Sequence, residues 1–143
     1  MGAEKIELSG SDWKMKEFIG LDWVWRNSIM PETEDRRWWY PAQVPGSVLH
    51  DLMKNNLVPD PYYELNSKLV EWVSARTWVY RKKFFVSEKY KGKRISVVFE
   101  GIDYSSEIFL NGISLGRQEG MYIPWEKEVG ESLKYGEENV LAV

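Results

Sequence analysis

The sequence has no cysteine and a single histidine among its 143 residues. The first absence excludes a disulfide framework, a thiolate metal site and a cysteine nucleophile. The histidine, His50, falls in a short segment with helical periodicity, and no serine is visibly paired with it as a nucleophile. Any metal site would therefore depend on oxygen ligands alone, and no such set stands out. We expect neither a metal nor a cofactor.

Long apolar runs and basic stripes are missing as well. No stretch approaches the roughly 20 apolar residues that a membrane-spanning helix needs, and the first residues lead into no apolar segment of a signal peptide. The net charge is −3, and lysine and arginine are scattered along the chain. These features predict a cytoplasmic protein without a membrane or nucleic-acid partner.

Aromatic residues, in contrast, make up 15% of the chain, with eight Trp, eight Tyr and five Phe. Strands of a β-sandwich favour aromatic side chains in their core. Carbohydrate offers a second explanation, because the apolar faces of sugars stack on Trp and Tyr. Composition cannot separate the two, since it does not tell buried rings from exposed ones.

The clearest local signal is a β-hairpin centred on Asn111-Gly112. This dipeptide supplies the two consecutive positive φ angles of a type I′ turn. A regular two-residue hairpin places Leu110 opposite Ile113 and Ile108 opposite Leu115. Together with an alternating strand from residue 94, the hairpin is expected to form the centre of an antiparallel sheet.

Three other segments have readable signals. Residues 76–86 alternate as a long strand that Lys82 interrupts, so a bulge or an exposed end is expected there. Residues 47–54 predict one short helix with Ser47 as its N-cap. Residues 20–41 lack periodicity but carry five aromatic residues, so this long loop is expected to pack on its own domain or on a neighbour.

Short strands separated by turn signals predict an all-β fold, an antiparallel β-sandwich with jelly-roll connections. The length, 143 residues, suits a single domain. The last five residues, 139–143, predict a strand, and a domain seldom stops inside an apolar strand. We therefore expect residues 1–143 to be the front part of a longer protein.

Catalytic motifs are not recognisable in the sequence. It shows no nucleophile elbow, phosphate-binding loop, dinucleotide-binding glycine pattern or zinc-ligand spacing. A glycosidase needs two carboxyl groups at a defined separation, and nothing marks such a pair among 22 acidic residues. From the residues alone, the chain is a β-sandwich with aromatic loops.

A series of short motifs in consistent order nevertheless resembles the N-terminal domain of glycoside hydrolase family 2, and within it the β-mannosidase-like branch. The motifs are Val44-Pro45-Gly46-Ser47-Val48 with Asp51-Leu52, Pro59-Asp60-Pro61-Tyr62-Tyr63, Trp78-Val79-Tyr80-Arg81, Phe99-Glu100-Gly101, Leu110-Asn111-Gly112 and the final Asn139-Val140-Leu141-Ala142-Val143. The resemblance runs from about Leu8 to the last residue.

The resemblance implies a galactose-binding-like jelly roll of the sugar-binding type, followed in the parent enzyme by immunoglobulin-like domains and a catalytic (β/α)8 barrel. The family's two catalytic glutamates lie on that barrel and act by a retaining mechanism. It follows that residues 1–143 would contain no catalytic residue and would be a C-terminally truncated first domain.

The resemblance also suggests substrate-binding residues. Asn66 stands where related β-galactosidases have an asparagine that reaches into the sugar site, and an amide can both donate to and accept from sugar hydroxyls. The alternative is that Asn66 caps a turn. Asp60 and Trp72 are lesser candidates, with turn formation and packing as their alternatives. The family pattern places His after the Val that follows the Val-Pro-Gly motif and one further residue, whereas Leu49 stands there and His50 comes one position later.

These arguments give one leading hypothesis and two alternatives. The leading one is a non-catalytic domain that supports the barrel of a β-mannosidase-like enzyme and lends a loop to its sugar site. Its partners would be carbohydrate and the downstream domains. The alternatives are an independent carbohydrate-binding module and a purely structural docking domain of a β-galactosidase or β-glucuronidase type of enzyme. An open sheet edge would also let truncated copies self-associate.

Overall fold

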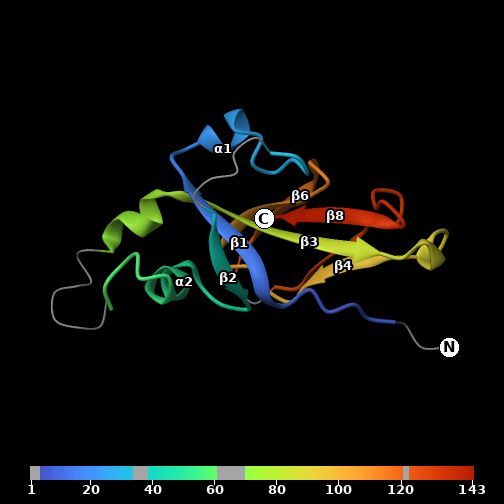
Figure 1. The fold of residues 1–143 in the computed structure, drawn as a ribbon, viewed down its shortest axis with the longest axis horizontal. Coiled ribbons are helices and arrows are strands. Elements are labelled where there is room, and N and C mark those ends of the chain that lie inside the picture. The colour runs from blue at the N-terminus through green and yellow to red at the C-terminus, as the bar shows by residue number, and fades with distance from the viewer. Residues whose placement is uncertain (1–3, 34–38, 61–69, 121–122) are drawn as a thin grey trace.

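The computed structural model describes residues 4–33, 39–60, 70–120 and 123–143, and these form an antiparallel β-sandwich with little helix (Figure 1). The strands of the described part are β1 (Gly10–Phe18), β2 (Tyr40–Val44), β3 (Thr77–Val86), β4 (Ser96–Phe99), β5 (Ser105–Leu110), β6 (Ile113–Glu119), β7 (Trp125–Glu128) and β8 (Glu137–Ala142). The helical elements are α1 (Asp22–Trp25), α2 (Val48–Lys54), and the 3-10 turns η1 (Glu71–Ala75) and η2 (Glu88–Tyr90). The predicted fold class and the short helix are confirmed.

Six of these strands form one sheet in the order β2-β1-β3-β8-β5-β6, and β4 and β7 form a small second sheet. The centre of the large sheet is therefore β3 and β8. The β5–β6 hairpin lies at an edge, and the strand preceding it belongs to the second sheet. The expectation that residues 94–116 form the centre was wrong, because a hairpin signal specifies local pairing and says nothing about which strand joins on its far side.

The turn of the hairpin is as predicted, with φ of 51° at Asn111 and 83° at Gly112. Leu110 lies opposite Ile113, but Ile108 lies opposite Gly116 instead of Leu115. Leu115 is the extra residue of a bulge in β6, so the register beyond it shifts by one. The bulge leaves Leu115 half-buried against the core, while Ile113 is 62% exposed.

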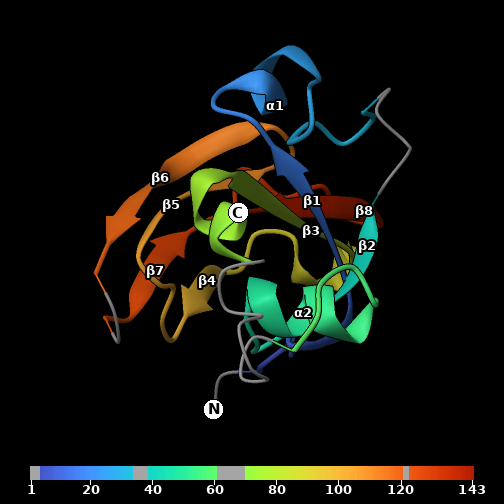
Figure 2. The ribbon, with the colours of Figure 1, turned by 90° about the vertical axis from the view of Figure 1, so that its left-hand side faces the viewer.

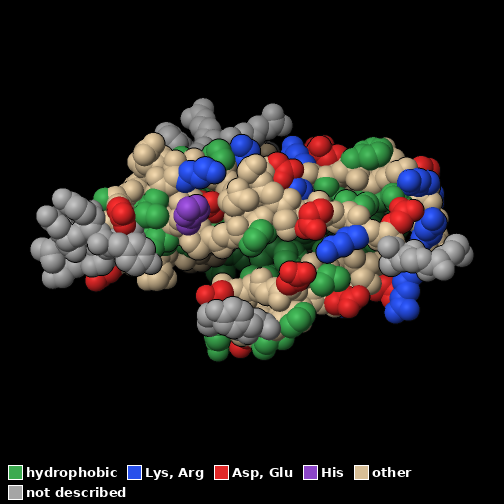
Figure 3. Space-filling model, turned by 90° about the horizontal axis from the view of Figure 1, so that it is seen from below, with side chains coloured by type: hydrophobic (Ala, Val, Ile, Leu, Met, Phe, Trp, Pro, Cys, Tyr) green, Lys and Arg blue, Asp and Glu red, His purple; other side chains and the backbone are tan. Residues whose placement is uncertain are grey.

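The two faces of the large sheet carry separate apolar clusters. Trp13, Met15, Ile108 and Leu141 lie in the inner cluster, which also contacts Phe99 and the rest of the small sheet. Figure 3 views the molecule from below and shows hydrophobic side chains on the floor of a hollow beside α2. The inner face of the large sheet is thus only partly covered by the described residues.

The outer face is covered by the loop that follows β1. Phe18, Val79, Phe109 and Ala142 form the outer cluster, and the ring centroid of Trp23 lies 5.6 Å from that of Phe109. Figure 2 shows the loop and α1 above this sheet. The described part of the long loop therefore packs on its own domain, as one of the two expectations held.

Buried cations hold parts of this arrangement in place. The Arg81 guanidinium, 7% exposed, donates to the backbone carbonyls of Ser28 (2.5 Å) and Met30 (2.7 Å) and so fixes the loop. Lys82 is 6% exposed and its ammonium binds Asp12. The register of β3 is continuous through Lys82, so the predicted bulge or exposed end was wrong. A lysine can lie inside a strand when a carboxylate pairs with its ammonium.

No helix in the described part of the chain is long and apolar enough to cross a membrane.

Candidate functional site

The predicted substrate-binding residues belong to the segment between α2 and β3. Asn66 lies outside the described residues. Asp60 is exposed in the segment after α2, and Trp72 is half-buried in η1. The structure therefore does not bring the three candidates together as one described site, and their roles in binding stay predictions.

Trp72 takes part in an aromatic pair next to the start of β3. Its ring centroid lies 6.1 Å from that of Trp78, whose indole N–H donates to the carbonyl of Val73 at 2.9 Å. The guanidinium of Arg76 lies 5.8 Å from the Trp72 ring and forms an ion pair with Glu17. These contacts hold η1 against the sheet and explain Trp72 as a packing residue.

Helix α2 is anchored through its cap and one buried carboxylate. The Ser47 hydroxyl accepts the backbone N–H of His50, which confirms the predicted N-cap. Asp51 is 1% exposed, and its carboxylate accepts the backbone N–H of Gln43 and the hydroxyl of Tyr80, both at 3.0 Å. Burial, and next the charge of Asp51, raise the pKa of Tyr80 far above its ordinary value. The carboxylate thus joins α2 to β2 and β3.

The glycine of the Val-Pro-Gly motif has a steric explanation. A Cβ on Gly46 would lie 2.4 Å from the backbone oxygen of Gln43. Only glycine permits so close an approach without a backbone shift. The motif residues at this position therefore fix how the chain leaves β2 and enters α2.

A second network was not visible in the sequence as more than a turn. Asn139 is 0% exposed, and its side chain accepts the Lys134 N–H and donates to the Lys134 carbonyl, both at 2.8 Å. It also accepts the side-chain amide of Asn111 at 2.8 Å, while the Asn111 Oδ1 accepts the Val140 N–H. The only available signal was the presence of both asparagines in the family motifs. Their shared role is to tie the hairpin turn to β8.

Exposed apolar side chains collect where several strands of the large sheet begin or end. The register places the end of β1, the start of β3, the end of β8, the start of β5 and the end of β6 at the same end of the sheet. Next to these termini, Ile19 and Leu21 are each 68% exposed, Tyr104 62% and Ile123 54%. We name these four residues the apolar rim. Figure 2 views this end, with the C-terminus in its middle.

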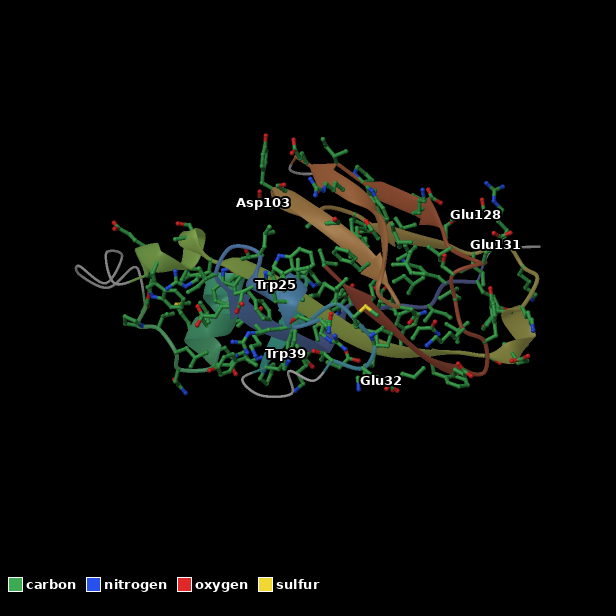
Figure 4. The ribbon with its side chains drawn as sticks, turned by 90° about the horizontal axis from the view of Figure 1, so that it is seen from above. Trp25, Glu32, Trp39, Asp103, Glu128 and Glu131 are labelled. Atoms are coloured by element: carbon green, nitrogen blue, oxygen red, sulfur yellow. The ribbon has the colours of Figure 1, made fainter. Side chains whose placement is uncertain are left out.

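A groove of about 940 Å³ lies on the outer face, at the boundary of the long loop. Its walls combine one aromatic ring with charged and polar side chains: Asp12, Lys14, Pro31, Glu32, Thr33, Trp39, Arg81 and Lys83. The Arg81 guanidinium lies 5.5 Å from the Trp39 ring, so it orients the aromatic wall as well as the loop. Trp39, Glu32 and the exposed Trp25 are labelled in Figure 4.

The described carboxyl groups show none of the tuning that acid catalysis requires. A general acid working near neutral pH needs a raised pKa. Where a described carboxyl group departs from its ordinary pKa, at Glu4, Glu7 and Asp12, the pKa is lowered, chiefly by a hydrogen bond from Tyr90, Ser9 and Lys82 respectively. Asp51, the only buried acid in the described part, is engaged in the anchor of α2.

The fold and these sites define a class: a galactose-binding-like β-sandwich whose buried polar groups serve the framework. The family model described as "Glycosyl hydrolase 2 galactose-binding domain-like" matches residues 19–143. The chain therefore belongs to this family, as the N-terminal domain of glycoside hydrolase family 2, and the sequence motifs are confirmed as its signature.

Individual relatives agree with this assignment. The chain is 32% identical to Beta-mannosidase B of Thermothelomyces thermophilus over 116 residues, 81% of this chain and 13% of that protein. The β-D-mannosidase of Dictyoglomus thermophilum has a TM-score of 0.79 and 38% identity, covering 96% of this chain and 15% of its own. A β-glucuronidase from an uncultured Clostridium species has a TM-score of 0.68 and 26% identity, covering 96% and 21%. The chain thus spans about a seventh of the mannosidases it matches.

Proposed function

We propose that this chain acts as the non-catalytic first domain of a β-mannosidase-like glycoside hydrolase, in which it supports the catalytic barrel and lends a loop to the sugar site. The parent would hydrolyse β-mannosides or a related glycoside with catalytic glutamates outside residues 1–143. Immunoglobulin-like domains and a (β/α)8 barrel of the same polypeptide would be its partners.

The observation that carries this proposal is the match along residues 19–143 to a domain of much longer glycosidases. The apolar rim supports it, because exposed apolar side chains gathered at one end of a domain suit contact with another domain. The segment from Asp60 to Trp72, which includes Asn66, begins and ends beside η1 and α2 and is the loop we propose to reach the sugar.

A second candidate function, an independent carbohydrate-binding module, is favoured by the groove at Trp39. Sugar sites combine an aromatic face with side chains that donate to and accept from hydroxyl groups. The groove offers Trp39 beside the acids Asp12 and Glu32 and the bases Lys14 and Lys83. Its size lies in the range of small-ligand sites.

Calorimetric titration of the folded chain with mannose, mannobiose, galactose and glucuronic acid separates the two functions. No heat with any of the four sugars is the result expected of a supporting domain. Saturable heat that Trp39→Ala abolishes would establish the binding module instead. Trp25→Ala is the matched control, because Trp25 is 83% exposed and does not line the groove.

Two further features complete the proposal. The outer edges of the large sheet, β2 and β6, each pair on one side only in the described part, so we expect the isolated chain to self-associate through an edge. Size-exclusion chromatography at low and high concentration tests this, and a monomer throughout would contradict it. We also retain a cytoplasmic location, which expression with a fluorescent tag in the native cell would check.

A further inference from the structure

The centre of the large sheet contains a gap at the end that carries the apolar rim. Strand β8 lies between β3 and β5, but both neighbours extend further toward this end than β8 does. The last β8 bridge to each of them involves Ala142, which lies opposite Arg81 of β3 and Phe109 of β5. Val143 adds one reciprocal pair of hydrogen bonds with Tyr80 at 2.9 Å.

Beyond Val143, each flanking strand continues for three residues. On one side these are Thr77, Trp78 and Val79 of β3, and on the other Ser105, Ser106 and Glu107 of β5. The outer partners of both strands are in place, since β3 pairs with β1 through Thr77 and β5 pairs with β6 through Ser105. The gap is therefore flanked by two ordered strands.

The alternation of the ladder identifies the backbone groups that face the gap. Tyr80 bonds toward β8, so Trp78, two residues earlier, presents its N–H and C=O to the same side. Asn111 also bonds toward β8, so Phe109 and then Glu107 present theirs from β5. In the described part of the chain, no strand partner lies opposite Trp78 or Glu107 on this side.

The side chains around the gap specify what would fit. Leu141 and Val143 point to the inner cluster and Ala142 to the outer one. The first position after Val143 would thus face the outer side, and the second would face the inner core beside Trp78. The strand that fits is extended, carries an apolar residue at its second position and has an N–H there to bond Trp78.

We propose that this gap is a three-residue acceptor slot for a β-strand, filled by the next residues of the same polypeptide. The source of the strand rests on the proposed function, in which the chain is the first part of a multidomain glycosidase; the slot itself rests on the register alone. Since the slot opens among the residues of the apolar rim, an inserted strand would emerge where a following domain could contact Ile19, Leu21 and Tyr104. It would couple the sheet directly to that domain.

Hydrogen exchange of three versions of the chain tests the slot: the unextended chain, the chain extended after Val143 by Thr-Val-Thr, and a matched control extended by Thr-Pro-Thr. Proline cannot donate to the Trp78 carbonyl. We expect Thr-Val-Thr to slow exchange of the Trp78 and Glu107 amides at least about tenfold relative to both other versions. The amides of Val79 and Ser106 bond to the outer partners and should be unchanged.

Equal protection of Trp78 and Glu107 in all three versions at low concentration would overturn the slot. Protection in the unextended chain that rises with protein concentration would show that a second copy fills the slot, and would overturn the same-chain source. Neither result depends on catalysis by a parent enzyme, so failure of the slot is distinguishable from failure of the proposed function.

Discussion

The buried carboxylate of Asp51 provides the sharpest stability prediction. Asp51→Ala removes the acceptor for the Gln43 N–H and for the Tyr80 hydroxyl, both 3.0 Å away. Leaving a buried donor unpaired costs about 1–3 kcal/mol. Because Gln43 and Tyr80 are only partly buried, we expect a combined loss of about 3 kcal/mol in the free energy of unfolding. For a domain of this size the melting temperature should fall by about 10 °C.

Two milder changes rank the contributions. Asp51→Asn keeps an acceptor for Gln43 and gives the Tyr80 oxygen a donor, so the loss should be about 1 kcal/mol. Tyr80→Phe removes one hydrogen bond to a charged group and should cost about 2 kcal/mol. The double variant Asp51→Ala with Tyr80→Phe should lose less than the sum of the two single variants, since they break the same bond.

The assay is urea unfolding followed by circular dichroism, with the slope against urea compared between variants. Asp22→Ala is the control, because Asp22 forms an exposed ion pair with Arg26 (2.9 Å) within α1, and its loss should stay within about 0.5 kcal/mol. If Asp51→Ala is no more destabilising than Asp22→Ala, the account of Asp51 as the anchor of α2 is refuted.

Three further changes probe other parts of the framework. Gly46→Ala should cost about 1–3 kcal/mol by thermal unfolding, because the new Cβ would meet the Gln43 oxygen at 2.4 Å; an unchanged melting temperature would contradict this. Asn139→Ala removes a fully buried side chain with both donors and its acceptor engaged, and should cost about 3 kcal/mol, unless denaturant titration shows a loss typical of surface sites. The pKa of Asp12 is lowered chiefly by the hydrogen bond from Lys82, so its contribution is present above the unfolded pKa of about 4 and disappears as the pH falls through the lower folded value. Asp12→Asn should therefore destabilise at pH 6, with the difference from the parent chain vanishing near pH 2, and a difference independent of pH would be contrary to this reasoning.

Much of the fold followed from local signals. The Asn111-Gly112 turn, the Ser47 cap of α2 and the long strand ending at Val86 were all predicted, because each depends on backbone angles or periodicity encoded within a few residues. The bulge at Leu115 and the buried Lys82 were not. A bulge depends on how β6 fits its partner, and Lys82 is buried because Asp12, 70 residues earlier, pairs with it.

The candidate site was less predictable for the same reason. Trp72 was expected either to pack or to bind, and its contact with Trp78 shows that it packs. The roles of Asp51 and Asn139 come from partners on other strands, which spacing along the chain does not reveal. The acceptor slot likewise depends on the relative lengths of β3, β5 and β8 across the sheet.

The supporting role can be measured in a chimera. The N-terminal domain of the β-D-mannosidase of Dictyoglomus thermophilum, to which this chain is 38% identical, would be deleted or replaced by residues 1–143 together with the host's own following strand. Hydrolysis of p-nitrophenyl β-mannoside is then compared for the intact enzyme, the deletion and the chimera. We expect the deletion to lose activity and the chimera to regain it, while the chain alone has none. A folded chimera no more active than the deletion, or hydrolysis by the chain alone, would contradict the account.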